Sequence, residues 1–428
     1  MFEAVTARSS HRQPGVRAAL AAAALVAGMT ATPPLASAAS AAGHADVLLS
    51  AVAGGPLADS GIALIMGPSM IPTPSPQFAE TVNELFLQPN GFAGQLQVLT
   101  TPQEPYLLDS SLAEGAQILV EKVLGLIESG EVDADNPVTV FGYSQSAALA
   151  TLAMQQLAEA DVPSSAVHFV LIGNSANPNG GMLVGFENMP ELAELMGQSQ
   201  VTLGNPTPSD LYPTSIYTLE YDGYADFPRY AGNIFAFLNA VMGTFVQHVS
   251  YLGLTPEQIA GATLLESSPD SLISSYVIES EYLPLLWPLL FVPITGKPLY
   301  ELMEPTMRIL VNLGYGNIEH GWNDGPADQP TMVTVDPQIV DWNGLSSALA
   351  AAAQTGWNNF VDAIFDPSTY VVTDMVDNPA LDLLLAAGDG VGLADGADPQ
   401  AMLQGLTNML WESLVGQYLD PAYWEAQG

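Results

Sequence analysis

The sequence has 428 residues, of which 48% are hydrophobic and 12% are charged, so it has ample apolar material for a folded core and is not a disordered protein. The 45 Asp and Glu residues against 7 Lys and Arg give a formal net charge of −38, which excludes nucleic acid as a partner because its phosphates would be repelled. Without Cys there is no disulfide, thiol nucleophile or Cys-ligated zinc site, and only 5 His are available for imidazole chemistry.

The N-terminal residues have the pattern of a secretory signal peptide. A basic segment with Arg8, Arg12 and Arg17 precedes a short apolar run at 18–29, and Ala36-Ser37-Ala38 is a small-residue cleavage signal. The apolar run is shorter than the ~20 residues that span a bilayer. We therefore expect residues 1–38 to be removed, the protein to be secreted or held in the cell envelope, and no transmembrane segment to remain.

Strand-like and helix-like segments then alternate. Apolar β-type runs occupy 61–66, 97–99, 138–141, 167–172 and 215–221, while 110–128 and 147–160 have helical periodicity. This alternation predicts an α/β fold with a mostly parallel sheet, in which ligands bind at the carboxyl ends of the strands.

The segment Gly142-Tyr143-Ser144-Gln145-Ser146 lies directly between a predicted strand and a predicted helix. A nucleophile elbow needs this arrangement, because a tight strand-to-helix turn exposes the serine hydroxyl. Ser146 stands where a second Gly is usual. The helix N-terminus and the backbone N–H of Gln145 would stabilise an oxyanion. An ordinary loop with a capping serine is the alternative, but the position favours Ser144 as a nucleophile.

A serine nucleophile needs a base, and in this fold class the chain order is Ser, acid, His. Three His residues follow Ser144: His168, His248 and His320. His168 falls inside an apolar strand, which indicates a core role. His248 follows an acidic turn and is the predicted base, with His320 the second candidate.

The acid is expected in the block at 221–228, Tyr-Asp-Gly-Tyr-Ala-Asp-Phe-Pro, which follows a predicted strand. Asp226 is preferred because an apolar residue and a proline follow it, and Asp222 is the alternative. Either carboxylate could instead serve a turn. A second oxyanion donor should come from the loop after the first strand, where Ser69 is the candidate.

These segments together resemble one known family. The elbow at 142–147, the acidic block at 221–228, His248 with Tyr251, and a Gly/Tyr-rich stretch at 310–316 are similar to the PE-PPE domain of mycobacteria and their relatives, over roughly 62–326. The resemblance implies a cutinase-like serine α/β-hydrolase that acts on acyl esters through Ser144, an Asp of the block and His248. A signal peptide stands where the family usually has a PE or PPE helical module, and the loop with Ser69 is less rich in Gly and Thr.

The predicted activity is a serine esterase or lipase for fatty acyl esters. Some members of the family resemble acyltransferases that move acyl groups between trehalose lipids, so transfer to a sugar or lipid hydroxyl is the alternative, and a silent envelope-binding protein is a second one. The expected partners are an acyl ester or glycolipid and, peripherally, envelope lipid. No metal-ligand cluster or phosphate-binding loop is evident, so no cofactor is expected.

The hydrolase domain is expected to cover 39–326. Within it, the apolar segment 282–293 contains three prolines, which argue against a transmembrane helix. It could form a lid over an acyl cleft or a buried connection on the sheet. Residues 327–428 have helical patterns around 345–364 and 399–414 and predict a packed helical extension.

Overall fold

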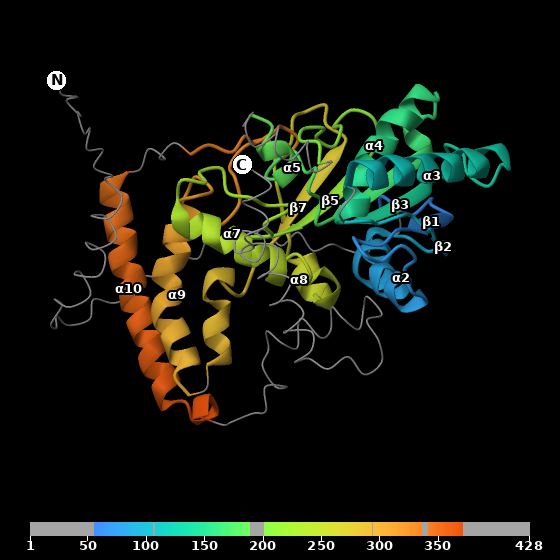
Figure 1. Ribbon diagram of the computed structural model, residues 1–428. Helices are drawn as coiled ribbons and strands as arrows, with labels where there is room; N and C mark the ends of the chain where they lie inside the picture. The colour runs from blue at the N-terminus through green and yellow to red at the C-terminus, as the bar shows by residue number, and fades with distance from the viewer. Residues whose placement is uncertain (1–54, 106–107, 189–200, 293, 336–340, 371–428) are drawn as a thin grey trace, which may run out of the picture. The chain divides into compact units, whose positions relative to one another are not determined.

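A computed structural model of the chain describes residues 55–105, 108–188, 201–292, 294–335 and 341–370. Its centre is a seven-stranded sheet in the order β2-β1-β3-β4-β5-β7-β6, in which only the β6–β7 pair is antiparallel (Figure 1). The prediction of an α/β fold with a mostly parallel sheet is confirmed. The strands are β1 (Ile62–Ile65), β2 (Gln95–Val98), β3 (Val138–Tyr143), β4 (Val167–Ile172), β5 (Thr214–Leu219), β6 (Thr263–Leu264) and β7 (Ile273–Ile278).

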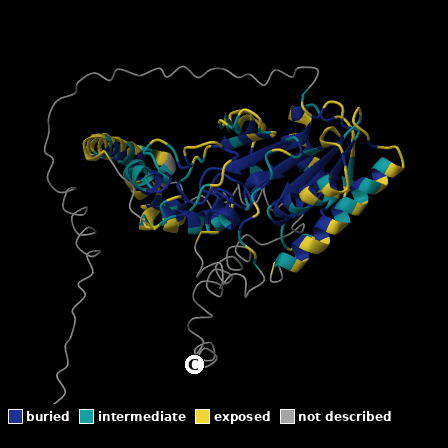
Figure 2. Cartoon of the chain, turned by 90° about the horizontal axis from the view of Figure 1, so that it is seen from above, coloured by how far each residue is buried: buried dark blue, intermediate teal, exposed yellow. Residues whose placement is uncertain are grey.

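The central strands β3, β4 and β5 are buried along almost their whole length because helices cover both faces of the sheet, and Figure 2 shows buried residues along the strands. One face packs on α3 (Leu108–Glu128) and α4 (Gln145–Glu159). The other packs on α2 (Pro76–Val82), η1 (Asn83–Leu87), η4 (Tyr251–Gly253) and α8 (Pro256–Ala260). Short elements complete this part: η2 (Gln88–Asn90), η3 (Ser164–Ala166) and α5 (Met182–Gly185).

Four helices form a second group, here called the cap: α7 (Ile234–Val246), η5 (Pro284–Phe291), α9 (Gly296–Asn312) and α10 (Trp342–Phe365). α9 packs against α7, η5 and α10, and η6 (Pro367–Tyr370) follows α10. The apolar segment predicted as a lid or a buried connection contains η5. Its buried residues pack on α7 and α9, with Trp287 beside Val246 and Leu286 beside Tyr300, so it is a connection within the cap rather than on the sheet.

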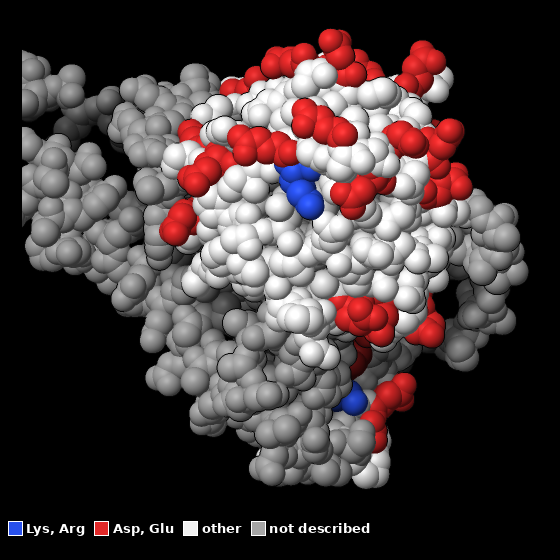
Figure 3. All heavy atoms as spheres, turned by 90° about the vertical axis from the view of Figure 1, so that its right-hand side faces the viewer, with Lys and Arg blue, Asp and Glu red and all other residues white. Residues whose placement is uncertain are grey.

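Some elements differ from the expectations. β5 ends at Leu219, two residues before the end of the strand predicted over 215–221. It ends there because the chain turns at Tyr221, whose φ is 68°. The helix expected around 345–364 is present as α10, whereas the one around 399–414 and the signal peptide lie outside the described residues. Within the described ranges, no helix is both long and apolar enough to cross a bilayer. On the face in Figure 3, acidic side chains are widely spread and basic ones are few.

Candidate active site

Ser144 lies in the tight turn between β3 and α4, as the sequence predicts. Its φ of 58° and ψ of −116° are strained for a residue with a side chain, and its N–H donates to Ile172 O at 3.0 Å. The turn needs Gly142, because a Cβ there would lie 2.7 Å from Ser146 O. The local sequence therefore forms an elbow with Ser144 at its tip.

Ser146, which stands where a second glycine is usual, takes part in this turn. Its Oγ accepts a hydrogen bond from Tyr143 N–H at 2.8 Å and donates one to Tyr143 O at 3.1 Å. Ser146 is fully buried, and these two hydrogen bonds satisfy its hydroxyl as both acceptor and donor inside the protein. The Ser146 side chain thus stabilises the turn by binding the backbone of Tyr143 on the other side of Ser144.

His248 connects Ser144 to a carboxylate. Its Nε2 is 2.8 Å from Ser144 Oγ, and its Nδ1 is 2.8 Å and 2.9 Å from the two carboxylate oxygens of Asp222. His248 is only 8% exposed, and Asp222 is completely buried. A serine hydroxyl, an imidazole and a carboxylate in this order can move a proton away from the serine oxygen.

The preference for Asp226 as the acid is corrected by this geometry, which places Asp222 against His248. The turn at Tyr221 directs the Asp226 carboxylate back onto the backbone, where its Oδ2 accepts the N–H of Tyr221 at 2.9 Å. Burial raises the pKa of Asp226 well above its usual value, although the Tyr221 N–H acts in the opposite direction. Asp226 is thus part of the loop's internal structure.

Tyr251 is a second partner of Asp222 that reasoning from residue chemistry did not assign. Its hydroxyl donates to Asp222 Oδ2 at 2.8 Å and accepts the N–H of Leu219 at 2.9 Å. The N–H of Tyr224 donates to the other carboxylate oxygen at 2.9 Å. The only sequence signal for Tyr251 was its place beside His248 in the family pattern. These donors hold the buried carboxylate in one orientation.

Ser69 and Gln145, the predicted oxyanion residues, are brought together. Gln145 is the first residue of α4, directly after Ser144, and its Oε1 accepts the Ser69 hydroxyl at 2.7 Å. Its Nε2 donates to Ser111 Oγ at 2.7 Å. The loop after β1 is therefore fixed to the start of α4, where the helix N-terminus favours negative charge.

The other two His candidates have partners elsewhere. His168 lies in β4 with its Nε2 3.3 Å from Ser215 Oγ, and burial lowers its pKa to about 4. His320 stacks on Trp322 with 3.9 Å between ring centroids and lies 3.4 Å from Asp324. The partners that these contacts give to His168 and His320 are residues other than Ser144 and Asp222.

Several proteins of Mycobacterium tuberculosis have similar sequences. The chain is 41% identical to "Uncharacterized PPE family protein PPE28" over 73% of its own length and 48% of that protein, and 34% identical to "Esterase PE16" over 86% of its own length and 67% of that protein. It is also 33% identical to "PE family protein PE3" over 69% of its own length and 62% of that protein. The chain thus spans about half to two thirds of the length of these relatives.

Among solved structures, "a novel cutinase-like protein from Cryptococcus sp." is 17% identical, with a TM-score of 0.27 over 40% of this chain and 80% of that one. The model of the PE-PPE domain family matches residues 35–316. That match covers more than half of the sequence and includes Ser144, Asp222 and His248, and the chain therefore belongs to the PE-PPE domain family.

Proposed function

We propose that this protein is a serine esterase for acyl esters, with Ser144 as nucleophile, His248 as general base and Asp222 as the acid that orients the imidazole. The observation that carries the proposal is the continuous hydrogen-bonded series from Ser144 Oγ through His248 to the buried Asp222 carboxylate. The 34% identity to a protein named "Esterase PE16" supports the same reaction class.

The reaction follows from the roles of these groups. His248 Nε2 takes the hydroxyl proton as Ser144 Oγ attacks the ester carbonyl, and the backbone N–H of Gln145 stabilises the oxyanion, with the Ser69 loop as the second candidate donor. Collapse of the tetrahedral intermediate breaks the ester bond. The leaving alkoxide takes its proton from His248, and an acyl group remains on Ser144. Water activated by His248 then releases the acid and restores the serine.

The test is hydrolysis of p-nitrophenyl acyl esters by wild type and three variants. Ser144→Ala should abolish turnover and labelling by a fluorophosphonate, and Asp222→Asn should lower kcat by about 10⁴ through loss of the correct His248 tautomer. Asp226→Asn is the matched control, because it changes a neighbouring buried carboxylate and should leave kcat within about twofold of wild type. Wild-type protein that neither hydrolyses these esters nor reacts with the fluorophosphonate would contradict the proposal and favour a silent binding protein.

The acyl acceptor is a separate part of the proposal. An acyl-enzyme on Ser144 can be resolved by water or by a sugar or lipid hydroxyl, so an acyltransferase would use the same three residues. We propose water as the acceptor, since the named relative is an esterase. Hydrolysis in the presence of trehalose or an alcohol distinguishes the two: transfer would give an acylated acceptor at the expense of free acid, detectable by mass spectrometry.

Secretion is proposed from the N-terminal pattern at 1–38. The mature chain should begin after Ala38 when the protein is recovered from culture medium or from the envelope fraction. N-terminal sequencing tests this directly, and an intracellular protein that keeps residues 1–38 would contradict it.

A further inference from the structure

Helix α7 has an exposed side made of large apolar residues. In its first five residues, Ile234 is 57% exposed, Leu238 42%, and Phe235 and Phe237 are each 38% exposed. Half-buried Val241, Met242 and Phe245 continue this side toward the end of the helix. Single exposed apolar residues are ordinary, but a cluster on one helix marks an interaction surface. We call these seven residues the outer face of α7.

The outer face differs from that of a normal surface helix, which carries charged residues toward water. No Asp, Glu, Lys or Arg occurs between Arg229 and Glu257. The inner side of α7 is also uncharged, with Ala236, Ala240 and Gly243 buried. Both sides of this helix are therefore suited to apolar surroundings, although among the described residues the outer one is much less covered than the inner one.

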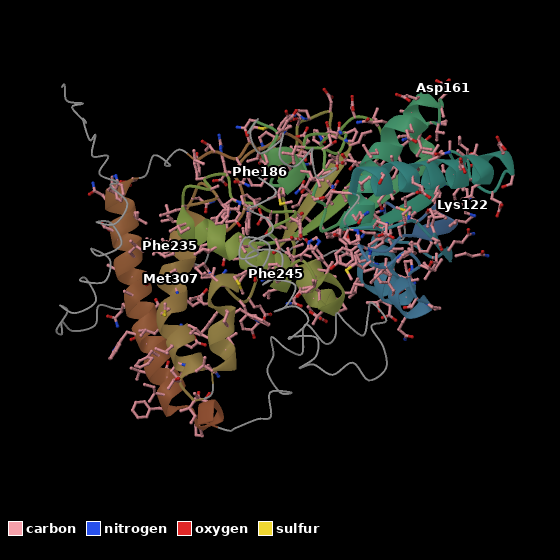
Figure 4. The ribbon with its side chains drawn as sticks, in the orientation of Figure 1. Lys122, Asp161, Phe186, Phe235, Phe245 and Met307 are labelled. Atoms are coloured by element: carbon pink, nitrogen blue, oxygen red, sulfur yellow. The ribbon has the colours of Figure 1, made fainter. Side chains whose placement is uncertain are left out.

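The inner side of α7 lies against the loop that bears the proposed acid. A Cβ on Gly243 would be 1.8 Å from Tyr221 O, and one on Gly223 would be 2.1 Å from Ala240 O, so the backbones touch. The helix ends at Val246, and the N–H of His248 donates to Gly243 O at 3.0 Å. Figure 4 labels Phe235 and Phe245 at the two ends of α7. The outer face thus belongs to the element that joins Asp222 to His248 along the chain.

Charge indicates what the outer face binds. Helices that dock on anionic lipid carry Lys and Arg around an apolar stripe, and α7 has none. The protein's net charge of −38 would also oppose an anionic surface. We propose that the outer face of α7 docks on the surface of an aggregated, uncharged ester lipid and holds the active site at that surface. The inference rests on the proposed esterase function for the identity of the lipid.

The experiment measures binding separately from turnover. Ser144→Ala protein is mixed with trioctanoylglycerol droplets, with and without added phosphatidylglycerol, and the bound fraction is measured by flotation. The double variant Phe235→Ser/Leu238→Ser in the same background should lose at least about tenfold in droplet partitioning, because two large apolar side chains no longer enter the lipid. Leu264→Ser is the matched control, since Leu264 is 60% exposed on β6 at the edge of the sheet, and it should bind as the parent does.

Added phosphatidylglycerol should weaken the binding of the Ser144→Ala protein to the droplets. Equal binding by the Ser144→Ala protein with and without Phe235→Ser/Leu238→Ser would overturn the proposal. In the background with Ser144 intact, hydrolysis of soluble p-nitrophenyl acetate should be unchanged by the α7 substitutions. This assay reports on the esterase alone, so failure of the esterase and failure of docking are distinguishable.

Two other occupants of the face are also tested. If light scattering shows a wild-type dimer that Phe235→Ser/Leu238→Ser converts to a monomer, the face is a contact between copies and the proposal is wrong. A photo-crosslinking residue at position 238 gives a second check. Lipid-free protein that crosslinks internally from this position would show that another part of the chain covers the face, which would equally overturn the proposal.

Discussion

The carboxylate of Asp222 accepts hydrogen bonds from His248, Tyr251 and the backbone of Tyr224. Of these, the Tyr251 hydroxyl can be removed alone by Tyr251→Phe. We expect kcat/KM to fall by about tenfold, the equivalent of about 1.4 kcal/mol, with KM little changed. A fall in kcat with KM unchanged would mark Tyr251 as a residue that positions the Asp222 carboxylate against His248.

Tyr212→Phe is the control for this prediction. Tyr212 is as deeply buried as Tyr251, and its hydroxyl donates to Val162 O at 3.0 Å, a contact that involves none of the proposed catalytic residues. Tyr212→Phe should lower the free energy of unfolding without lowering kcat/KM. If Tyr251→Phe also leaves kcat/KM unchanged, Tyr251 has only a packing role.

Asp226 makes stability depend on pH. Burial raises its folded-state pKa well above 3.8, so the native state binds the proton more tightly than the unfolded state does. The stabilisation is complete below about pH 3.8 and is lost as pH rises toward the folded-state pKa. Asp226→Asn removes this loss, so thermal unfolding should show a variant that is more stable than wild type at pH 8, with a smaller difference at pH 4. A difference that shrinks as pH rises would contradict the assignment.

The choice between the two acids shows what could be predicted at this scale. Ser144 and His248 are predicted from the sequence because each stands at a recognisable place: Ser144 in a strand-to-helix turn, and His248 in the stretch after an acidic loop. Asp222 and Asp226 lie four residues apart in one loop. Which carboxylate faces His248 depends on the left-handed turn at Tyr221 and on the Tyr251 hydroxyl, and neither is readable from local pattern.

At the scale of elements, the contact between α7 and the acid loop depends on glycine. Gly243→Ala would place a methyl group 1.8 Å from Tyr221 O, so the helix and the loop must separate. We expect a loss of about 1–3 kcal/mol in the free energy of unfolding, together with lower activity as Asp222 shifts. Urea denaturation and ester hydrolysis measure the two effects.

Gly125→Ala in α3 is the matched substitution, because a Cβ at Gly125 would meet nothing within 4 Å. It should stabilise the protein by about 0.5–1 kcal/mol through higher helix propensity. If Gly243→Ala and Gly125→Ala change the free energy of unfolding equally, α7 does not pack closely against the loop that contains Tyr221.

Sequence patterns found the buried strands β1, β3 and β4 because both of their faces are apolar. β7 was not predicted, since its sequence Ile-Ser-Ser-Tyr-Val-Ile has two serines and no simple period. α9 was missed because Pro298 and Pro305 are typical helix breakers. Pro298 lies in the first turn, where a missing N–H costs little, and packing on α10 supports the rest of the helix.

For the whole molecule, the net charge of −38 predicts a response to salt. Repulsion among carboxylates disfavours the compact state, and ionic strength screens it, so the melting temperature should rise by a few degrees between about 10 mM and 0.5 M NaCl. The opposing contribution is the attraction within ion pairs such as Arg308 with Glu220, whose closest atoms are 3.5 Å apart. A melting temperature that falls with salt would show that such pairs outweigh the repulsion.

The hydroxyl of Ser146 bears on how related elbows are recognised in other sequences. A search written for Gly-x-Ser-x-Gly would pass over this chain, although the turn at Ser144 has the geometry of a nucleophile elbow. Here the fifth position holds a side chain that bonds to both polar groups of Tyr143, so the position demands a small residue rather than glycine alone. Patterns that admit serine there, and that require a buried strand before the turn and a helix after it, should reveal hydrolases that glycine-only patterns leave unassigned.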